Sequence, residues 1–195
     1  MKPIIIAVIG ASCAGKDTLM RQLYWELSCG DMIDRFPDVY YVVSSTTRPP
    51  RKGERNNEDY HFLTDAEFQY NIDEGHMLEW TEFRGWKYGT DKKSICLKDG
   101  AINIGVFNLQ GIRSLLLHDD FTLIPIYLDV NWRERLKRSI NREDHLTLEM
   151  IRRLVTDFKD FRDVDNVLAA APNSLYYKGD YDIEDVLEDI LGKIK

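Results

Sequence analysis

The sequence predicts an α/β fold in which a parallel sheet is covered by helices on both faces. Three observations predict it: the apolar run Ile4–Ile9, the glycine-rich loop directly behind it, and the alternation of β and α segments along the rest of the chain. Strands buried on both faces appear as continuous apolar runs, and alternation of this kind is typical of parallel sheets.

The elements of the core follow from hydrophobic periodicity. The first helix is expected at Lys16–Ser28, because Leu19, Leu23 and Leu27 recur at helical spacing and Gly30 ends the pattern. Short apolar runs predict the further strands Val39–Val43, Ile102–Phe107, Leu123–Leu128 and Leu175–Lys178. Amphipathic stretches predict the further helices Gln110–Leu117, Trp132–Ile140, Thr147–Val164 and Ile183–Ile194.

The rhythm changes between about Thr46 and Thr90. A Pro/Arg/Gly-rich loop leads to the short run Tyr60–Leu63, a helix opened by the capping box Thr64–Glu67, and a second run Met77–Phe83. We therefore expect a small α+β lobe at about residues 46–90, inserted into a core of residues 1–45 and 91–195 within one domain.

The loop behind the first strand has the pattern of a phosphate-binding loop of the P-loop NTPase type. Its glycines let the backbone turn so that successive N–H groups and a helix N-terminus face one anion, while Lys16 reaches the outer phosphates. The expected ATP-binding residues are Gly10, Ala11, Ser12, Cys13, Ala14, Gly15, Lys16, Asp17 and Thr18. Asp17 stands where a hydroxyl usually holds Mg²⁺, which predicts either a carboxylate–metal contact or weaker metal binding.

Composition limits the partners. With a net charge of −7 over 195 residues, the chain has no general attraction to nucleic acid. Its three cysteines are odd in number and lack metal-ligand spacing, and the first apolar run is too short for a membrane span or signal peptide. We expect a soluble cytoplasmic protein, monomeric or homodimeric, with no nucleic-acid or membrane partner.

A second group of anion-binding residues lies in the expected lobe. Arg48 and Arg51 are three apart on a proline-stiffened loop, and Tyr60 follows. Arginine forks suit phosphate oxygens, and a tyrosine hydroxyl adds another donor. Alone this loop could be a solvated basic turn, but behind a phosphate-binding loop it favours a phosphorylated acceptor.

Together these motifs resemble the guanylate kinases. The resemblance runs from about Ile4 to Leu154, through Gly-Ala-Ser-x-x-Gly-Lys, Ser44-Ser45-Thr46-Thr47-Arg48-x-x-Arg51, Asp59-Tyr60-His61-Phe62, Leu78-Glu79-Trp80, Tyr88-Gly89-Thr90 and Gln110-Gly111. It implies ATP-dependent phosphorylation of GMP, and of dGMP, in purine nucleotide metabolism, with Mg²⁺. The GMP-binding residues that it implies are Ser44, Arg48, Arg51, Tyr60, Glu79, Tyr88, Thr90 and Asn108.

The resemblance also implies an arginine-rich lid at about residues 138–150. Arg138 and Arg142 are four apart, and Arg153 lies eleven residues further on. With Lys16, these are the expected catalytic residues, because phosphoryl transfer needs positive charge over the equatorial oxygens. The neighbouring Arg135, Lys137 and Arg152 weaken this signal, since arginines are common on exposed helix faces.

Three departures from the family pattern keep alternatives open. Asp17 replaces the loop hydroxyl and becomes a candidate metal ligand, Val106 and Asn108 replace two carboxylates, and only Tyr177–Asp180 loosely matches the adenine-side segment. The first two changes could be coupled, with Asp17 supplying the lost negative charge. A ribose 1,5-bisphosphate kinase, a deoxynucleoside monophosphate kinase and a non-catalytic guanylate kinase-like binding module therefore remain as alternatives.

Overall fold

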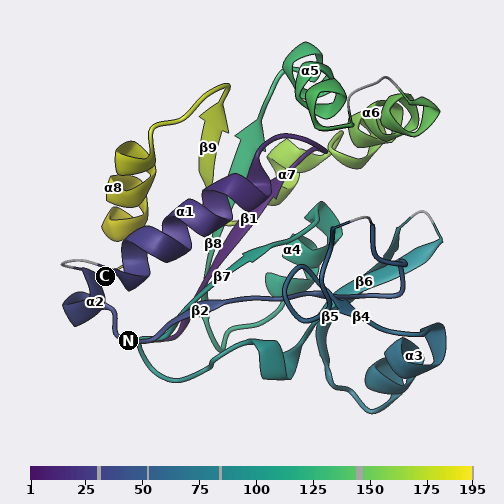
Figure 1. Ribbon diagram of the computed structural model, residues 1–195. Coiled ribbons are helices and arrows are strands. Elements are labelled where there is room, and N and C mark those ends of the chain that lie inside the picture. Colours follow the sequence, from purple (N-terminus) through teal and green to yellow (C-terminus); the bar gives the residue numbers. More distant parts are fainter. Residues whose placement is uncertain (30–31, 52, 84, 144–146, 195) are drawn as a thin grey trace.

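The computed structural model describes residues 1–29, 32–51, 53–83, 85–143 and 147–194, and within these ranges it leaves the side chains of Arg142, Glu143 and Glu149 undescribed. Within the described residues, five parallel strands form the core sheet in the order β2-β7-β1-β8-β9 (Figure 1). These strands are β1 (Ile4–Gly10), β2 (Val39–Tyr41), β7 (Ile102–Val106), β8 (Thr122–Asp129) and β9 (Leu175–Lys178). The predicted fold class is confirmed.

The side chains of β1 alternate between two apolar clusters, one on each face of the sheet. Ile4, Ile6 and Val8 pack with helices α1 (Lys16–Ser28) and α8 (Ile183–Lys193). Ile5, Ala7 and Ile9 pack on the other face, with α4 (Leu109–Leu115) and α7 (Val164–Ala169). Because successive residues of a strand point to opposite faces, an unbroken apolar run serves both clusters.

The lobe forms a second sheet, whose four strands among the described residues follow the order β4-β3-β6-β5. Its elements are β3 (Ser45–Thr46), β4 (His61–Phe62), α3 (Asp65–Asp73), β5 (Met77–Phe83) and β6 (Trp86–Asp91), followed by the 3₁₀ turn η1 (Lys92–Ser94). The predicted capping box at Thr64 and Glu67 is present. The lobe leaves the core after β2 and returns before β7, and these two strands are hydrogen-bonded neighbours.

Two further helices lie beside the carboxyl end of the core sheet. Figure 1 shows α5 (Trp132–Glu143) and α6 (Leu148–Asp160) side by side, beyond the N-terminal end of α1. The short helix α2 (Met32–Arg35) lies at the opposite end of α1. Helices α5 and α6 include all three arginines expected to serve phosphoryl transfer, Arg138, Arg142 and Arg153.

Several predicted boundaries need correction. The single helix expected at Thr147–Val164 is wrong: α6 ends at Asp160, and α7 starts at Val164. The break follows from Phe161, whose ring stacks on Tyr127 of β8 with centroids 5.6 Å apart and so draws the chain toward the core. Strand β2 is shorter than the expected Val39–Val43, and β3 and β6 were not predicted as strands.

Candidate active site

The phosphate-binding loop joins β1 to α1 at the carboxyl end of the sheet. Gly15 has φ +100°, a left-handed conformation that L side chains rarely adopt, so the turn into α1 requires glycine here. The ammonium of Lys16 donates to the carbonyl oxygen of Ala11 at 2.9 Å and is folded back over the loop. Burial lowers the pKa of Lys16, against the opposing influence of Asp17 and Asp157.

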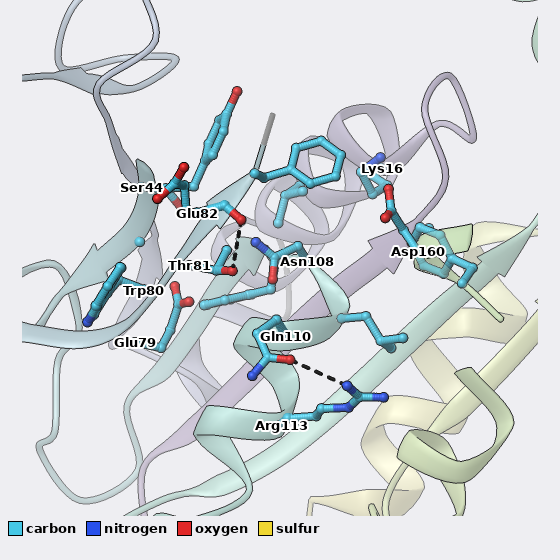
Figure 2. Close-up of a pocket in the computed structure, with 18 of the residues that line it drawn as sticks. Lys16, Ser44, Glu79, Trp80, Thr81, Glu82, Asn108, Gln110, Arg113 and Asp160 are labelled. Carbon is cyan, nitrogen blue, oxygen red and sulfur yellow. Dashed lines mark hydrogen bonds between the residues drawn. The ribbon is translucent and has the colours of Figure 1, made fainter. Parts of the chain in front are cut away.

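A cavity of about 780 Å³ extends from this loop to the lobe. Figure 2 shows Lys16 and Asp160 on one side of it and Ser44, Glu79 and Trp80 on the other, with Asn108 between them. The expected site residues that line it are Gly10, Ser12, Lys16, Ser44, Tyr60, Glu79, Tyr88 and Asn108. One cavity therefore joins residues expected on the donor side with residues expected on the acceptor side.

Among the polar residues that line the lobe side of the cavity, Glu79 on β5 is the most buried. Its side chain is 6% exposed, and Thr90 of the paired strand β6 donates from Oγ1 to its Oε1 at 2.8 Å. A Cβ on Gly111 would lie 2.9 Å from the other carboxylate oxygen, so α4 approaches Glu79 as closely as a glycine allows. Burial raises the pKa of Glu79 to about 7, although the hydrogen bonds from Thr90 act in the opposite direction.

Asn108 begins α4 as its N-cap. Its side-chain oxygen accepts from the backbone N–H of Gly111 at 2.7 Å, so this oxygen is already engaged in holding the helix start beside Glu79. Val106, which ends β7, also lines the cavity and brings no polar atom to it.

The arginine loop is organised by Glu54. Both terminal nitrogens of Arg48 contact the Glu54 carboxylate, at 2.9 and 3.0 Å, and the Arg51 backbone N–H donates to it at 2.6 Å. Burial alone would lower the pKa of Arg48, but Glu54 raises it above the ordinary arginine value. The Arg48 guanidinium also lies 5.4 Å from the ring centroid of Tyr60, which in turn contacts Tyr88 edge-on.

The structure brings an arginine of the lobe near one of α6. Partial burial together with the guanidinium groups of Arg153 and Arg48 lowers the pKa of Arg51. The positive charges of Arg51 and Arg153 thus influence each other, and a region of shared positive charge suits an anion. The third lid arginine, Arg142, lies in α5, and its side chain is outside the described residues.

Arg138 of α5 contacts the phosphate-binding loop at Ala14. One terminal nitrogen donates to the carbonyl oxygen of Ala14 at 3.3 Å, and the other contacts the Asp180 carboxylate at 3.2 Å. Asp180 belongs to the Tyr177–Asp180 segment that loosely matched the adenine-side motif. This segment therefore lies near the loop, linked to it through Arg138.

The candidate metal ligand Asp17 lies in the first turn of α1, where its side chain and that of Thr18 are exposed. Among the described residues, no group of three or more His, Cys, Asp or Glu side chains could hold a metal ion by itself. A magnesium ion keeps several waters and commonly binds one or two carboxylates plus substrate phosphates, and Asp17 beside Lys16 fits that limited role.

Sequence reasoning missed two residues that contact the phosphate-binding loop. Arg135 and Asp157 are 4% and 5% exposed, and both hydrogen-bond to Ser12. The interpretation of Arg135 as a residue of an exposed helix face was wrong. One signal was available, because Asp157 follows Met150 by seven residues and so shares its buried helix face.

Within the part of the chain that the structure describes, no helix combines the length and apolar character needed to cross a membrane.

Comparison with known proteins gives a consistent result. The family described as guanylate kinase matches residues 1–169. Over 158 residues the chain is 32% identical to the guanylate kinase of Campylobacter jejuni, covering 79% of this chain and 73% of that protein. Over 113 residues it is 42% identical to the guanylate kinase of Rubrobacter xylanophilus, covering 57% and 54% of the two chains.

A solved structure shares the fold. The crystal structure of guanylate kinase from Anaplasma phagocytophilum superimposes with a TM-score of 0.62 at 19% identity, and the match covers 99% of this chain and 85% of that one. At this identity the likeness concerns the arrangement of the chain.

Proposed function

The chain belongs to the guanylate kinase family, and from that premise we propose that its cavity transfers the γ-phosphoryl group of ATP to GMP. One observation supports this acceptor above others: Glu79, a buried carboxylate at the lobe end of a cavity whose other end is the phosphate-binding loop. A carboxylate facing two adjacent N–H donors suits guanine, whereas adenine would leave it without those donors.

On the donor side, the loop amides and the N-terminus of α1 hold the phosphates of ATP. Lys16 exchanges its contact with the Ala11 carbonyl for contacts with the outer phosphates, where its charge offsets theirs. Arg138, close to Ala14 and Asp180, adds positive charge on the same side.

On the acceptor side, Glu79 and Thr90 read the base, and Ser44 contributes a hydroxyl from the same cavity wall. The GMP phosphate is bound by Arg48, Arg51, Tyr60 and Tyr88. It would compete with the Glu54 carboxylate for the two terminal nitrogens of Arg48. The base is therefore held by β5 and β6, and the phosphate by Tyr88 of β6 together with the arginine loop and Tyr60.

The transfer itself depends on position and charge. An oxygen of the GMP phosphate attacks in line, and Arg153, with Arg142 and Arg138, stabilises the charge that spreads over the equatorial oxygens. No general base is required, because a nucleotide phosphate is already ionised at neutral pH. The electrostatic influence of Arg153 on Arg51 supports a position for Arg153 between the acceptor phosphate and the transferring phosphoryl group.

Asp17 would hold Mg²⁺ together with the nucleotide phosphates, directly or through water. The ion supplies neutralisation of the β- and γ-phosphate charge. Since Val106 is apolar and the Asn108 oxygen caps α4, Asp17 is the carboxylate best placed for this role among the described residues of the loop and β7.

The deciding experiment is coupled ADP release with ATP, Mg²⁺ and a panel of acceptors: GMP, dGMP, AMP, CMP, UMP, dTMP and ribose 1,5-bisphosphate. We expect turnover with GMP and dGMP only. Turnover confined to ribose 1,5-bisphosphate or to a pyrimidine nucleotide would overturn the acceptor assignment. Measurable GMP binding without turnover of any acceptor would favour a binding module.

A further inference from the structure

A buried ion pair fastens α5 and α6 to the phosphate-binding loop. Nη1 of Arg135 lies 2.7 Å from Oδ2 of Asp157, with the two side chains 5% and 6% exposed. The Asp157 carboxylate accepts from the backbone N–H and from the hydroxyl of Ser12, at 3.0 and 3.1 Å. Arg135 donates to the carbonyl oxygens of Ser12 and Val130, at 3.3 and 3.1 Å. All three polar groups of Ser12 thus contact one ion pair.

Stability alone does not account for this arrangement. Replacing a buried ion pair by well-packed apolar residues is often neutral or stabilising, because desolvation offsets the Coulomb attraction. Helix α6 turns Asp157 toward the loop while Ile151, Val155 and Phe158 of the same helix are 44%, 54% and 61% exposed. Met150 and Phe161 lie on the same side of α6 as Asp157, so apolar burial contributes to this orientation, but it does not explain a charged residue on the inward face.

The ion pair is one helical turn from a proposed catalytic group. Arg153 precedes Asp157 by four residues on α6, so the two residues share one side of the helix. Arg153 also lies close enough to Arg51 of the lobe to lower its pKa. The anchorage of Asp157 on Ser12 therefore governs how far Arg153 stands from the phosphate-binding loop.

We propose that Asp157 and Arg135 are positioning residues for phosphoryl transfer, which act through Arg153 by holding α6 at a defined distance from the phosphate-binding loop. The inference rests on the proposed function, in which Arg153 contacts the transferring phosphoryl group. Neither residue of the pair touches the reacting atoms in this scheme. Both act by fixing the helix that brings the guanidinium.

A double-mutant cycle between Asp157→Asn and Arg153→Ala tests the coupling. Asparagine keeps the shape and one acceptor oxygen but removes the charge. We expect Asp157→Asn to lower kcat about tenfold in the parent chain and less than about twofold in the Arg153→Ala background, because contacting or coupled residues are non-additive. Equal fold losses in both backgrounds would overturn the proposal, since a general structural defect does not depend on Arg153.

Two further variants separate positioning from folding. Asp163→Asn removes one partner of the more exposed Arg113–Asp163 pair, just beyond α6, and should leave kcat within about twofold of the parent. The double variant Arg135→Met/Asp157→Leu replaces the buried pair with apolar side chains, so it is expected to keep its melting temperature yet lose kcat as Asp157→Asn does. Parental kcat in this double variant would contradict the proposal.

The affinity for ATP, measured by calorimetry in the absence of acceptor, gives a second readout of the same double-mutant cycle. Because Arg153 faces the transferring phosphoryl group, Arg153→Ala and Asp157→Asn should weaken ATP binding non-additively. If the parent chain fails to phosphorylate GMP, the proposed function is overturned, while the calorimetric cycle still decides on the positioning role. Additive losses of ATP affinity would reject that role whatever the acceptor.

Discussion

The hydroxyl of Thr90 donates to the buried carboxylate of Glu79 across two paired strands, at 2.8 Å. The bond occupies one oxygen of the carboxylate and fixes the plane in which the other lone pairs point. The backbone of Gly111 closes the opposite side of the carboxylate. Glu79 is therefore held in one orientation, as discrimination between bases requires.

Replacing Glu79 by Gln should erode selectivity for guanine. Glutamine keeps the size of the side chain but offers one acceptor oxygen and an N–H₂ group that faces the guanine donors. Since hydrogen bonds to charged groups contribute about 1.5–3 kcal/mol, we expect kcat/KM for GMP to fall about 10- to 100-fold, with the value for IMP, which lacks the 2-amino group, falling less. Steady-state kinetics with both acceptors measure the change. Glu74→Gln, an exposed carboxylate at the end of α3, is the matched control.

Activity should decline when Glu79 becomes protonated. Burial raises the pKa of Glu79 to about 7, and only the ionised form accepts both guanine N–H groups. The kcat/KM for GMP should therefore be constant above pH 7. Below pH 7 it should decrease, with a slope that approaches about tenfold per pH unit. A pH profile of the parent checks this, and the Glu79→Gln profile should lack the contribution of this group. Identical profiles would remove Glu79 from acceptor binding.

Glu79 should also make folding stability depend on pH, but here stability decreases as the pH rises, whereas activity increases. Because the folded-state pKa of Glu79 lies above its ordinary value, the folded chain binds more protons than the unfolded chain between about pH 4.5 and 7. The contribution of Glu79 to the free energy of unfolding is present below this window and is lost as the pH rises through it. Urea unfolding of the parent and of Glu79→Gln at pH 5 and pH 8 measures the difference, which should favour the variant more at pH 8.

Arg48 and Arg51 should differ in their effects on stability, although both are proposed to bind the acceptor phosphate. Arg48 is 8% exposed and paired with Glu54, so Arg48→Ala leaves that carboxylate unpaired and should lower stability by about 1–3 kcal/mol. Arg51 is more exposed, and Arg51→Ala should leave the melting temperature within about 2 °C of the parent. Both variants should raise the KM for GMP. Thermal melts measure the difference in stability between the two variants, and steady-state kinetics measure the KM for GMP. Unchanged GMP kinetics in both variants would place the acceptor phosphate elsewhere.

Changing Asp17 should alter the dependence on magnesium. In Asp17→Ala, we expect the Mg²⁺ concentration for half-maximal activity to rise about tenfold, equivalent to about 1.4 kcal/mol, because a hard oxygen ligand is lost. Asp17→Ser supplies the hydroxyl found in the family pattern and should partly restore it. Activity measured over a magnesium titration checks both variants. A titration curve unchanged in Asp17→Ser and in Asp17→Ala would refute a metal role for this carboxylate.

Loss of the α4 cap should be visible as instability. Asn108→Ala removes the bond to the Gly111 N–H and should lower the free energy of unfolding by about 1 kcal/mol, whereas Asn108→Asp should keep it. Denaturant unfolding of the two variants gives the comparison. Equal stability of Asn108→Ala and the parent would show that the cap contributes nothing measurable.

Much of the core could be predicted because local patterns and tertiary contacts agree there. The apolar run of β1 and the stripe of α1 predicted both elements to within one residue. Strands β3 and β6 lack such an apolar pattern. In β6, Gly89 and Thr90 are buried because the neighbouring strands β3 and β5 cover them, although neither residue is a large apolar one. The break after α6 was missed because Phe161–Asp163 contain neither glycine nor proline.

The residues of the candidate site divide in the same way. Lys16, Glu79 and Tyr88 lie in sequence motifs and line one cavity, as the motifs implied. Arg135 and Asp157 are 22 residues apart on different helices, and only the folded chain brings their charges together on Ser12. Amphipathic periodicity offers two apolar stripes on α6, one with Met150 on the side of Asp157 and one with Phe158, and the folded chain turns the first inward.

The lobe is joined to the core through two neighbouring strands, since β2 precedes it and β7 follows it. Because β2 and β7 are parallel, the chain leaves the core at the carboxyl end of β2 and re-enters it at the amino end of β7. If the proposed site is correct, changes within residues 45–91 can alter acceptor preference while the phosphate-binding loop stays as it is, although α4 of the core also borders Glu79. The segments 42–44 and 92–101, which join lobe and core, are therefore the natural junctions for exchanging lobes between related kinases.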